Sequence, residues 1–301
     1  MYDLIIIGAG PAGITAGVYA ARKKMNFLVL TMDIGGQTVW SSGVENYTGY
    51  QFISGGDLAQ KFESHMRQYA IQLHESERVT QVEAHDGGFS VRTDKQEYQA
   101  RTVIIASGKR SKELGVPGER EFRNKGLTYC ATCDGPLFSG KDVAVIGGGN
   151  SALDACLQLE RIARRVYLIA NASALGGDAV MREKVLQGAN LTVLLNTNIA
   201  AVTGTAFVEG VRVRHEGNES DIPVQGVFVE AGLIPNADFV AAVKKNELGE
   251  IVVDCGNRTD IPGLFAAGDV SSVPDKQIII AAGEGAKACL GAFRYLAQHA
   301  F

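Results

Sequence analysis

The residues best suited to chemistry are two cysteines, Cys130 and Cys133, with Asp134 directly after the second. Cysteines at this spacing can close a small, strained disulfide that exchanges electrons readily. If they open a helical turn, the N-terminal amides of that turn stabilise a thiolate. The acid beside them can supply or accept the proton of each exchange. The pattern therefore predicts thiol–disulfide exchange, with Cys130, Cys133 and Asp134 as the catalytic residues.

A CxxC pattern alone is also typical of two buried cysteines or of half a zinc site. Zinc is disfavoured because the other cysteines stand singly, at Cys156, Cys255 and Cys289, and the chain has no second CxxC. We therefore expect no metal site. The redox interpretation is favoured by position, since the motif lies between two nucleotide-binding patterns, just before the second of them.

The first of these patterns is a glycine-rich loop between an expected strand, Leu4–Ile7, and an expected helix, 14–24. Gly8 makes the tight turn, Gly10 lets the backbone approach a pyrophosphate, and Gly13 lets helix and strand pack closely. The helix N-terminus then faces the phosphates. The sequence therefore predicts a dinucleotide site here, with cofactor-binding residues Gly8, Gly10, Pro11, Ala12 and Gly13.

The next strand is expected at Phe27–Leu30, and it lacks the ribose-binding acid at its end, where Asp33 is the nearest candidate. Two glycine-containing loops follow, and their backbones can pack closely against a flat ligand. Their amide side chains have the groups needed to hydrogen-bond a ring edge, although two surface turns would look the same. The residues proposed for this contact are Gly35, Gly36, Gln37 and Asn46.

The second pattern repeats the first, with a strand from Asp142 and a glycine-rich loop whose candidate cofactor residues are Gly147, Gly149, Asn150 and Ala152. A β-meander is expected after each unit. Its strands in the first unit are 79–84, 89–93 and 103–106, and in the second unit 191–195, 211–215 and 227–230. The expected fold is α/β, with two Rossmann-like dinucleotide-binding domains, each with a β-meander, the second inserted into the first. The domains are expected at 1–111, 112–236 and 237–301.

The last segment returns to the first domain through an apolar strand that ends in Gly268 and Asp269. An acid at the carboxyl end of a strand, in the crevice where ligands bind, is placed to hold a ribitol or ribose hydroxyl. Gln277 and Ile278 follow as further candidate cofactor residues. A helix is then expected over 283–298, with its Ala- and Gly-rich start close to a flat ring and its positive end towards it.

Composition and charge restrict the possible partners. The 301 residues include 36 glycines and only 7 prolines, as in a glycine-turned α/β protein, and the net charge is −4. That charge gives no reason to expect a nucleic-acid or anionic-membrane partner. We expect no signal peptide and no bilayer-spanning segment. Five cysteines without an export signal suggest a cytoplasmic protein in which a CxxC is catalytic.

Taken together, the motifs resemble those of the low-molecular-weight thioredoxin reductase family over essentially the whole chain. The motifs that carry the resemblance are 8–13, 35–37, 130–135, 147–149 and 268–270. The stretch 276–287 looks closest to the reductase core of the alkyl hydroperoxide reductase flavoprotein, without that relative's thioredoxin-like portion. The resemblance implies FAD in the discontinuous domain, a pyridine nucleotide in the inserted domain, a homodimer and a rotation between domains. It also implies that Cys133 lies nearest the flavin and that Cys130 attacks a disulfide of thioredoxin or a thioredoxin-like protein.

One departure from this family concerns the electron donor. Members that use NADPH carry an arginine-rich run after the second strand of the nucleotide domain, whereas here 170–178 holds no cation and contains Asp178. The acid suited to the ribose of NADH is also missing, since Ala170 stands at the strand end. Arg182 and Lys184 are the nearby cations. We therefore expect NADPH to be disfavoured, and either NADH or a non-nicotinamide donor, such as ferredoxin, a flavodoxin or a deazaflavin, to serve. The alternatives are an NADH-linked reductase that feeds a peroxiredoxin, and a flavin-based redox sensor.

Overall fold

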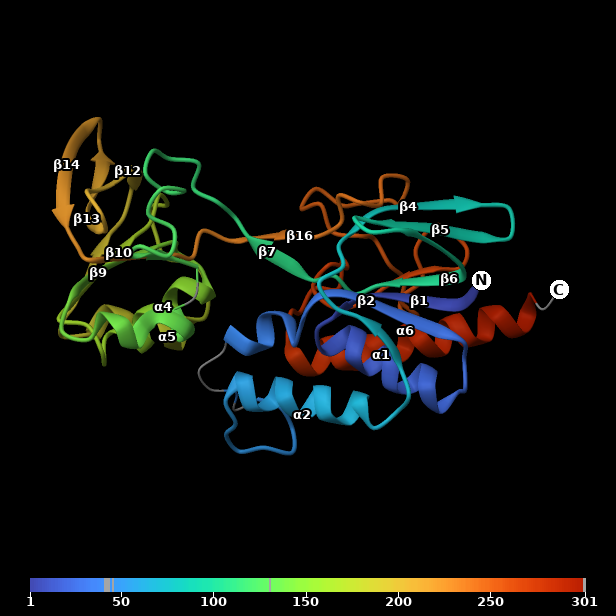
Figure 1. Cartoon of the computed structure of the whole chain (residues 1–301). Helices are drawn as coiled ribbons and strands as arrows, with labels where there is room; N and C mark the ends of the chain where they lie inside the picture. Colours follow the sequence, from blue (N-terminus) through green and yellow to red (C-terminus); the bar gives the residue numbers. More distant parts are fainter. Residues whose placement is uncertain (41–43, 45, 130, 300–301) are drawn as a thin grey trace. The chain divides into compact units, whose positions relative to one another are not determined.

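The computed structural model describes residues 1–40, 44, 46–129 and 131–299, with only the backbone described at Trp40, Thr132 and Cys133. The chain forms two compact units (Figure 1). Unit 1 comprises Met1–Arg110 and Ile234–Phe301, and unit 2 comprises Ser111–Leu233. Unit 2 is therefore inserted into unit 1, which is the mixed α/β arrangement expected from the sequence.

Unit 1 is built on a sheet in the order β3-β2-β1-β6-β5-β4, with β17 also paired to β6. β1, β2, β3, β6 and β17 run parallel, and the β4–β5–β6 part is an antiparallel meander. The strands are β1 (Tyr2–Ala9), β2 (Phe27–Ile34), β3 (Gln72–His74), β4 (Val79–His85), β5 (Gly88–Thr93), β6 (Glu97–Ile105) and β17 (Leu264–Ala266).

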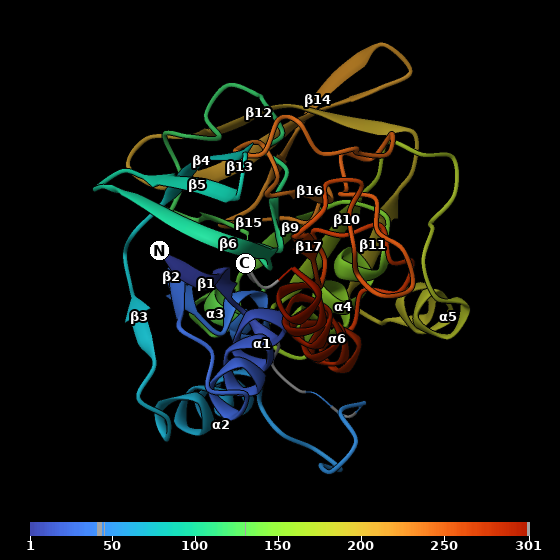
Figure 2. The same ribbon diagram turned by 90° about the vertical axis from the view of Figure 1, so that its right-hand side faces the viewer.

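The central strand β1 is buried on both faces, as an apolar run in a parallel sheet requires. Leu4 and Ile6 pack into the core beside helices α1 (Pro11–Arg22) and α6 (Ile278–Gln298). Ile5 and Ile7 pack into the core on the opposite face. Figures 1 and 2 both show α1 and α6 side by side along one face of the sheet, and α2 (Gly55–Arg67) lies beyond α1. This packing fixes the start of α1, and with it the first glycine-rich loop.

Two expected elements of unit 1 extend further than their apolar runs indicate. Strand β2 continues through Thr31 to Ile34, so Asp33 lies inside the strand and exposed, not in a turn after it. Helix α6 begins at Ile278 instead of residue 283, with Gln277 as its N-cap residue. The shift matters for the site because Gln277 and Ile278 stand at the N-terminus of a long helix.

Unit 2 contains a parallel sheet in the order β11-β10-β9-β15-β8 and a separate antiparallel sheet β12-β13-β14. Residues of β9 alternate between a core shared with the helices and a core shared with the antiparallel sheet. Figure 1 shows the helices of this unit and the antiparallel sheet on opposite sides of the parallel sheet. The elements are β8 (Leu127–Thr128), β9 (Asp142–Ile146), α4 (Asn150–Leu159), β10 (Arg165–Ile169), α5 (Ala179–Gln187), β11 (Leu191–Leu194), β12 (Thr197–Gly204), β13 (Val208–His215), β14 (Asn218–Pro223) and β15 (Gly226–Val229).

The expected meander of unit 2 was wrong in two of its three strands. The segments 191–195 and 227–230 correspond to β11 and β15, which pair in parallel with β10 and β9. The meander consists of β12, β13 and β14, of which only β13 was expected in it. A short apolar run does not distinguish a buried parallel strand from a meander strand, so its pairing cannot be read from its residues.

The two connections between the units are β7 (Lys109–Ser111) and β16 (Leu233–Pro235), which pair with each other. Beside this pair, Asn236 N donates to Gly108 O at 2.9 Å and Lys112 N donates to Gly232 O at 2.9 Å, an antiparallel pattern. Short helices α3 (Ala131–Asp134), η1 (Gly36–Trp40) and η2 (Gly135–Phe138) complete the elements. Within the described residues, no helix is long and apolar enough to cross a bilayer.

Candidate functional site

The first glycine-rich loop has the close contacts that its residues predict. A methyl group on Gly13 would lie 1.8 Å from Gly8 O, and one on Gly8 would lie 2.4 Å from Ala106 O. A methyl group on Gly10, by contrast, would meet nothing within 4 Å. Helix α1 starts just after this open point, and no side chain caps it. Free amides at the N-terminus of a helix favour an anionic group, so the loop fits a pyrophosphate.

Each of the two loops proposed to contact a flat ring touches another candidate cofactor segment of unit 1. A methyl group on Gly36 would lie 3.4 Å from Gly10 Cα, which places the Gly35–Gly36 turn beside the first glycine-rich loop. Gln37 Nε2 donates to Lys109 O at 3.1 Å. Asn46 Nδ2 donates to Gln277 Oε1 at 3.0 Å, so two candidate residues 231 positions apart are in direct contact.

Asp269 is the acidic residue among the candidate cofactor residues of unit 1, and its side chain is half-buried. Within the described chain it has no hydrogen bond or ion pair. Burial raises the pKa of Asp269, although nearby Lys276 and Lys109 act to lower it. The preceding residue is held firmly, because Gly268 N donates to Glu284 Oε2 at 2.7 Å. A carboxylate without a partner is costly to keep half-buried unless a ligand satisfies it. Asp269 therefore fits the hydroxyl-binding role expected from its place after β17.

The second glycine-rich loop, in unit 2, has the same design. A methyl group on Gly147 would lie 2.1 Å from Glu230 O, whereas one on Gly149 would meet nothing within 4 Å. No side chain caps helix α4, and Ala152 is fully buried at its start. The side chain of Asn150 has a different contact, because its Oδ1 accepts from Asp178 N at 2.7 Å. Asn150 therefore holds the segment after β10 against the glycine-rich loop.

That segment, 170–178, folds back onto the loop. Gly176 N donates to Gly148 O at 2.8 Å, and the Leu175 side chain is buried in the core of unit 2. Asp178 caps helix α5 by accepting from Val180 N at 2.9 Å and Met181 N at 3.1 Å. Asp178 is therefore held to the glycine-rich loop through its backbone amide, while its carboxylate caps helix α5.

Of the two cations that follow this segment in the sequence, Arg182 is engaged by a backbone carbonyl group. Arg182 Nη1 donates to Leu175 O at 3.2 Å, which ties its guanidinium to the segment itself. Lys184 is exposed on helix α5, two residues further along. The segment 170–178, which the structure describes throughout, thus brings no cation to the second glycine-rich loop.

The cysteine motif is described only in part. Cys130 lies outside the described residues, and Cys133 is described through its backbone, in helix α3. Asp134 is half-buried at the end of that helix and accepts a short hydrogen bond from Thr128 Oγ1. Thr128 is a residue of β8 that no pattern in the sequence indicates as functional. Its hydroxyl group orients the carboxylate proposed as the acid/base.

Glu230 is a second residue that sequence patterns did not indicate. It follows β15, and its own carbonyl group forms the close contact with Gly147. Burial, with a smaller effect of Asp154, raises the pKa of Glu230 to about 7, against a hydrogen bond from Ser151 that lowers it. The protonated carboxyl group is therefore favoured in the folded state up to about pH 7.

Because of this raised pKa, Glu230→Gln is expected to stabilise the protein progressively as pH rises. The folded state holds the Glu230 proton more tightly than the unfolded state, so its stabilising effect is complete below about pH 4.5 and is lost as pH rises through about 7. Glutamine does not ionise, so the variant avoids this loss. Its gain in free energy of unfolding over the original protein reaches at most about 3 kcal/mol at high pH. Urea unfolding at pH 5 and pH 8 measures it, with exposed Glu121→Gln as the control. An equal effect of Glu230→Gln at both pH values would contradict the prediction.

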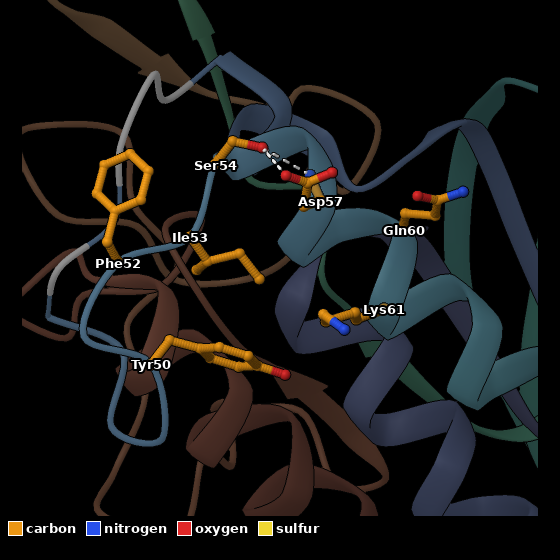
Figure 3. Close-up of a pocket in the computed structure, with 7 residues that line it drawn as sticks. All are labelled: Tyr50, Phe52, Ile53, Ser54, Asp57, Gln60 and Lys61. Atoms are coloured by element: carbon orange, nitrogen blue, oxygen red, sulfur yellow. Dashed lines mark hydrogen bonds between the residues drawn. The ribbon is translucent and has the colours of Figure 1, made fainter.

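Two cavities of about 480 Å³ lie elsewhere in unit 1. Figure 3 shows the first, formed by the start of α2 and the preceding loop, where Ser54 accepts from the Asp57 amide. It is lined by Tyr50, Phe52, Ile53, Ser54, Asp57, Gln60 and Lys61. The second lies between residues 254–265 and the C-terminal half of α6. Neither cavity is lined by a residue proposed above for cofactor binding.

Comparison with known proteins decides the family. Residues 2–285 match the model of the pyridine nucleotide-disulphide oxidoreductase family. The chain belongs to this family. It is an oxidoreductase with the two-domain, Rossmann-like fold of thioredoxin reductases, and its family and fold are those of flavoproteins. The thioredoxin reductase of Lactococcus lactis has a TM-score of 0.92 with it at 32% identity, covering 99% of this chain and 100% of that one.

Among the family's curated relatives, an alkyl hydroperoxide reductase protein of Pseudomonas putida is 42% identical over 98% of this chain. A Bacillus subtilis protein named NADH dehydrogenase is 40% identical over 99% of it. The chain spans only 58% and 59% of the lengths of these two relatives. The solved thioredoxin reductase of T. acidophilum is 38% identical, with a TM-score of 0.88, covering 97% of this chain and 98% of that one.

Proposed function

We propose that this chain is an FAD-dependent disulfide reductase that passes electrons through the Cys130/Cys133 pair to thioredoxin or a thioredoxin-like protein. The observation that carries the proposal is the pair of uncapped helices, each behind an open glycine loop, one in each unit. A CxxC lies on the chain between them. The full-length likeness to a thioredoxin reductase of Lactococcus lactis supports the same function.

In this proposal FAD belongs to the discontinuous domain, 1–111 and 237–301. Gly8, Gly10 and the start of α1 hold its pyrophosphate, and Asp269 accepts a hydrogen bond from a hydroxyl group of its sugar or ribitol part. The residues gathered towards the ring are Gly35, Gly36, Gln37, Asn46, Gln277 and Ile278. When bound, FAD supplies a store for two electrons between the donor and the disulfide.

The residues of the domain 112–236 then carry out the exchange. The thiolate of Cys130 attacks the partner's disulfide and forms a mixed disulfide, while one partner sulfur leaves as a thiol after taking a proton. Cys133 attacks the sulfur of Cys130, which restores the internal disulfide and releases the second partner thiol. Asp134 exchanges the protons, in the orientation that the Thr128 hydroxyl group gives it. The partner thus gains two electrons and two protons, and the cysteine pair loses them.

The proposed donor is NADH or a non-nicotinamide reductant, and the proposed assembly is a homodimer in the cytoplasm. A reductase that feeds a peroxiredoxin is the second candidate, supported by the 42% identity with the alkyl hydroperoxide reductase protein of Pseudomonas putida. The two functions are separated by supplying the dithionite-reduced protein with either a thioredoxin or a peroxiredoxin disulfide. Reduction of neither, with FAD bound, would favour a redox sensor.

Asp269→Ala is expected to weaken FAD binding by about 10- to 100-fold. A hydrogen bond to a charged group contributes about 1.5–3 kcal/mol, and about 1.4 kcal/mol is tenfold in affinity. Titration of the apoprotein with FAD, followed by quenching of flavin fluorescence, measures the dissociation constant. Asp86→Ala, in an exposed turn of the same unit, is the control. Unchanged affinity in Asp269→Ala would remove Asp269 from the site, and release of FMN from the purified protein would overturn FAD as the cofactor.

A further inference from the structure

A buried carboxylate, Glu250, joins two lysines in unit 1. Glu250 Oε1 accepts from Lys109 Nζ at 2.9 Å and from Lys276 Nζ at 3.1 Å. The Glu250 side chain is 6% exposed, and those of the two lysines are 13% and 23% exposed. Three charged groups, two of them positive, are therefore brought together with little exposure to water.

The rest of the hydrogen bonding fixes this cluster in place. Asn246 Nδ2 donates to Glu250 Oε2 at 2.8 Å, so both oxygens of the carboxylate are satisfied. Lys276 Nζ also donates to Ser271 O, in the turn that follows Gly268 and Asp269. The two ammonium groups thus have one defined position each, instead of the many that a surface lysine adopts.

The cluster is attached to the chain segments proposed for the flavin. Lys109 offers its carbonyl group to Gln37, and Lys276 directly precedes Gln277. Both lysines also act to lower the pKa of Asp269, which places their charges near that carboxylate. An apolar trio would connect these segments more favourably, because buried ion pairs usually repay their desolvation poorly. With Asp269 included, two fixed ammonium groups stand beside two carboxyl groups, and these charges act on the electrostatics of the segments proposed for the flavin.

We infer that Glu250 holds Lys109 and Lys276 as a cationic clamp that stabilises the reduced form of the flavin. The inference rests on the proposed function. Two-electron reduction with uptake of one proton leaves the ring system with one additional negative charge. In a site shielded from water, a fixed ammonium group stabilises that charge far more than it would in water. Lys109 and Lys276 are thus positioning and tuning residues for redox potential, with Glu250 moderating their charge.

The test is the midpoint potential of the bound flavin, measured by equilibration with a reference dye in the purified, FAD-saturated full-length protein. Lys109→Met is expected to lower the ratio of reduced to oxidised flavin at a fixed potential by about tenfold, which is a shift of about 30 mV to lower potential for a two-electron couple. Glu250→Gln, which keeps the shape but removes the negative charge, is expected to shift the potential upward.

Two further variants provide the controls. Arg110→Met removes a positive charge from the neighbouring residue, which is exposed and paired with Asp238, and is expected to leave the potential unchanged. Lys109→Arg keeps the charge and is expected to restore the potential of the original protein. A merely structural cluster predicts a different result, namely weaker FAD binding in both Lys109→Met and Glu250→Gln and no opposite shifts.

Opposite shifts in Lys109→Met and Glu250→Gln support the clamp. Shifts in the same direction, or no shift in either, with FAD bound, overturn it and leave the proposed function intact. If Lys109→Met does not retain FAD, Glu250→Gln is the deciding variant. An upward shift of its midpoint potential supports the clamp, and a downward shift or no shift overturns it. A wild-type protein that takes up no FAD refutes the proposed function itself.

Discussion

Cys133→Ser is expected to reduce thioredoxin-disulfide turnover by at least about 10³-fold, while FAD content and fold stay unchanged. Removing one member of a group that acts as a unit removes nearly all of its catalytic effect. Serine cannot form the internal disulfide, so electrons have no route from the flavin to the partner. The rate is measured by following thioredoxin dithiol formation after anaerobic reduction with dithionite, so that the identity of the natural donor does not affect the result.

Cys130→Ser is expected to lose activity to the same extent, because Cys130 is the proposed nucleophile towards the partner. The two variants differ in one respect: Cys130→Ser leaves Cys133 unable to form a mixed disulfide with thioredoxin, whereas Cys133→Ser traps one through Cys130. Cys255→Ser, at an exposed free cysteine, is the matched control and is expected to be fully active. Normal turnover in either CxxC variant would remove the motif from the reaction.

The second prediction concerns the electron donor. NADPH is expected to reduce the flavin no faster than NADH does. A 2′-phosphate carries up to two negative charges, and each charge-assisted hydrogen bond to arginine contributes about 1.5–3 kcal/mol. The segment 170–178 offers no cation, its Asp178 is tied to the glycine-rich loop through the backbone amide, and Arg182 is bonded to Leu175 O. The loss of two or three contacts removes several orders of magnitude of preference for NADPH.

Stopped-flow mixing of the oxidised protein with equal concentrations of NADPH or NADH, followed by flavin bleaching, measures this preference. A clear NADPH advantage would contradict the prediction, and its loss in Arg182→Ala would identify the residue responsible. Lys184→Ala is the control for a nearby exposed cation. Reduction by ferredoxin or a deazaflavin, with no bleaching by either nucleotide, supports a non-nicotinamide donor.

The sequence predicts the parts of this protein that rest on local rules. Gly8 and Gly13 are expected to make close backbone contacts at fixed spacing, and both contacts are present in the structure. The space beside Gly10 is open, as an approach to a pyrophosphate requires. The positions of β1 and β9 are also predicted, because each is an apolar run followed by a glycine turn. By contrast, the pairing partners of β11 and β15 depend on contacts with residues distant in the sequence. The residues of a short apolar run do not indicate which strand it will pair with.

The same reason explains which site residues the sequence could not indicate. Glu250 lies far along the chain from Lys109, and Thr128 is an ordinary strand residue until Asp134 is seen to accept its hydroxyl group. Asn150 was expected among the cofactor residues from its place in a motif, but its side-chain oxygen is occupied by the Asp178 amide. The position of a residue in a motif predicts its backbone conformation. Its side-chain hydrogen-bond partner can be identified only in the folded structure.

The paired connections β7 and β16 have a consequence for how the chain folds. Because the chain leaves unit 1 and returns to it on neighbouring antiparallel strands, unit 1 experiences the whole inserted unit as the loop of a hairpin. The entropy lost in closing a loop grows only with the logarithm of its length, so each doubling of the insertion costs about 0.6 kcal/mol. Unit 1 can therefore carry an entire second domain at nearly the same entropic cost as a long surface loop.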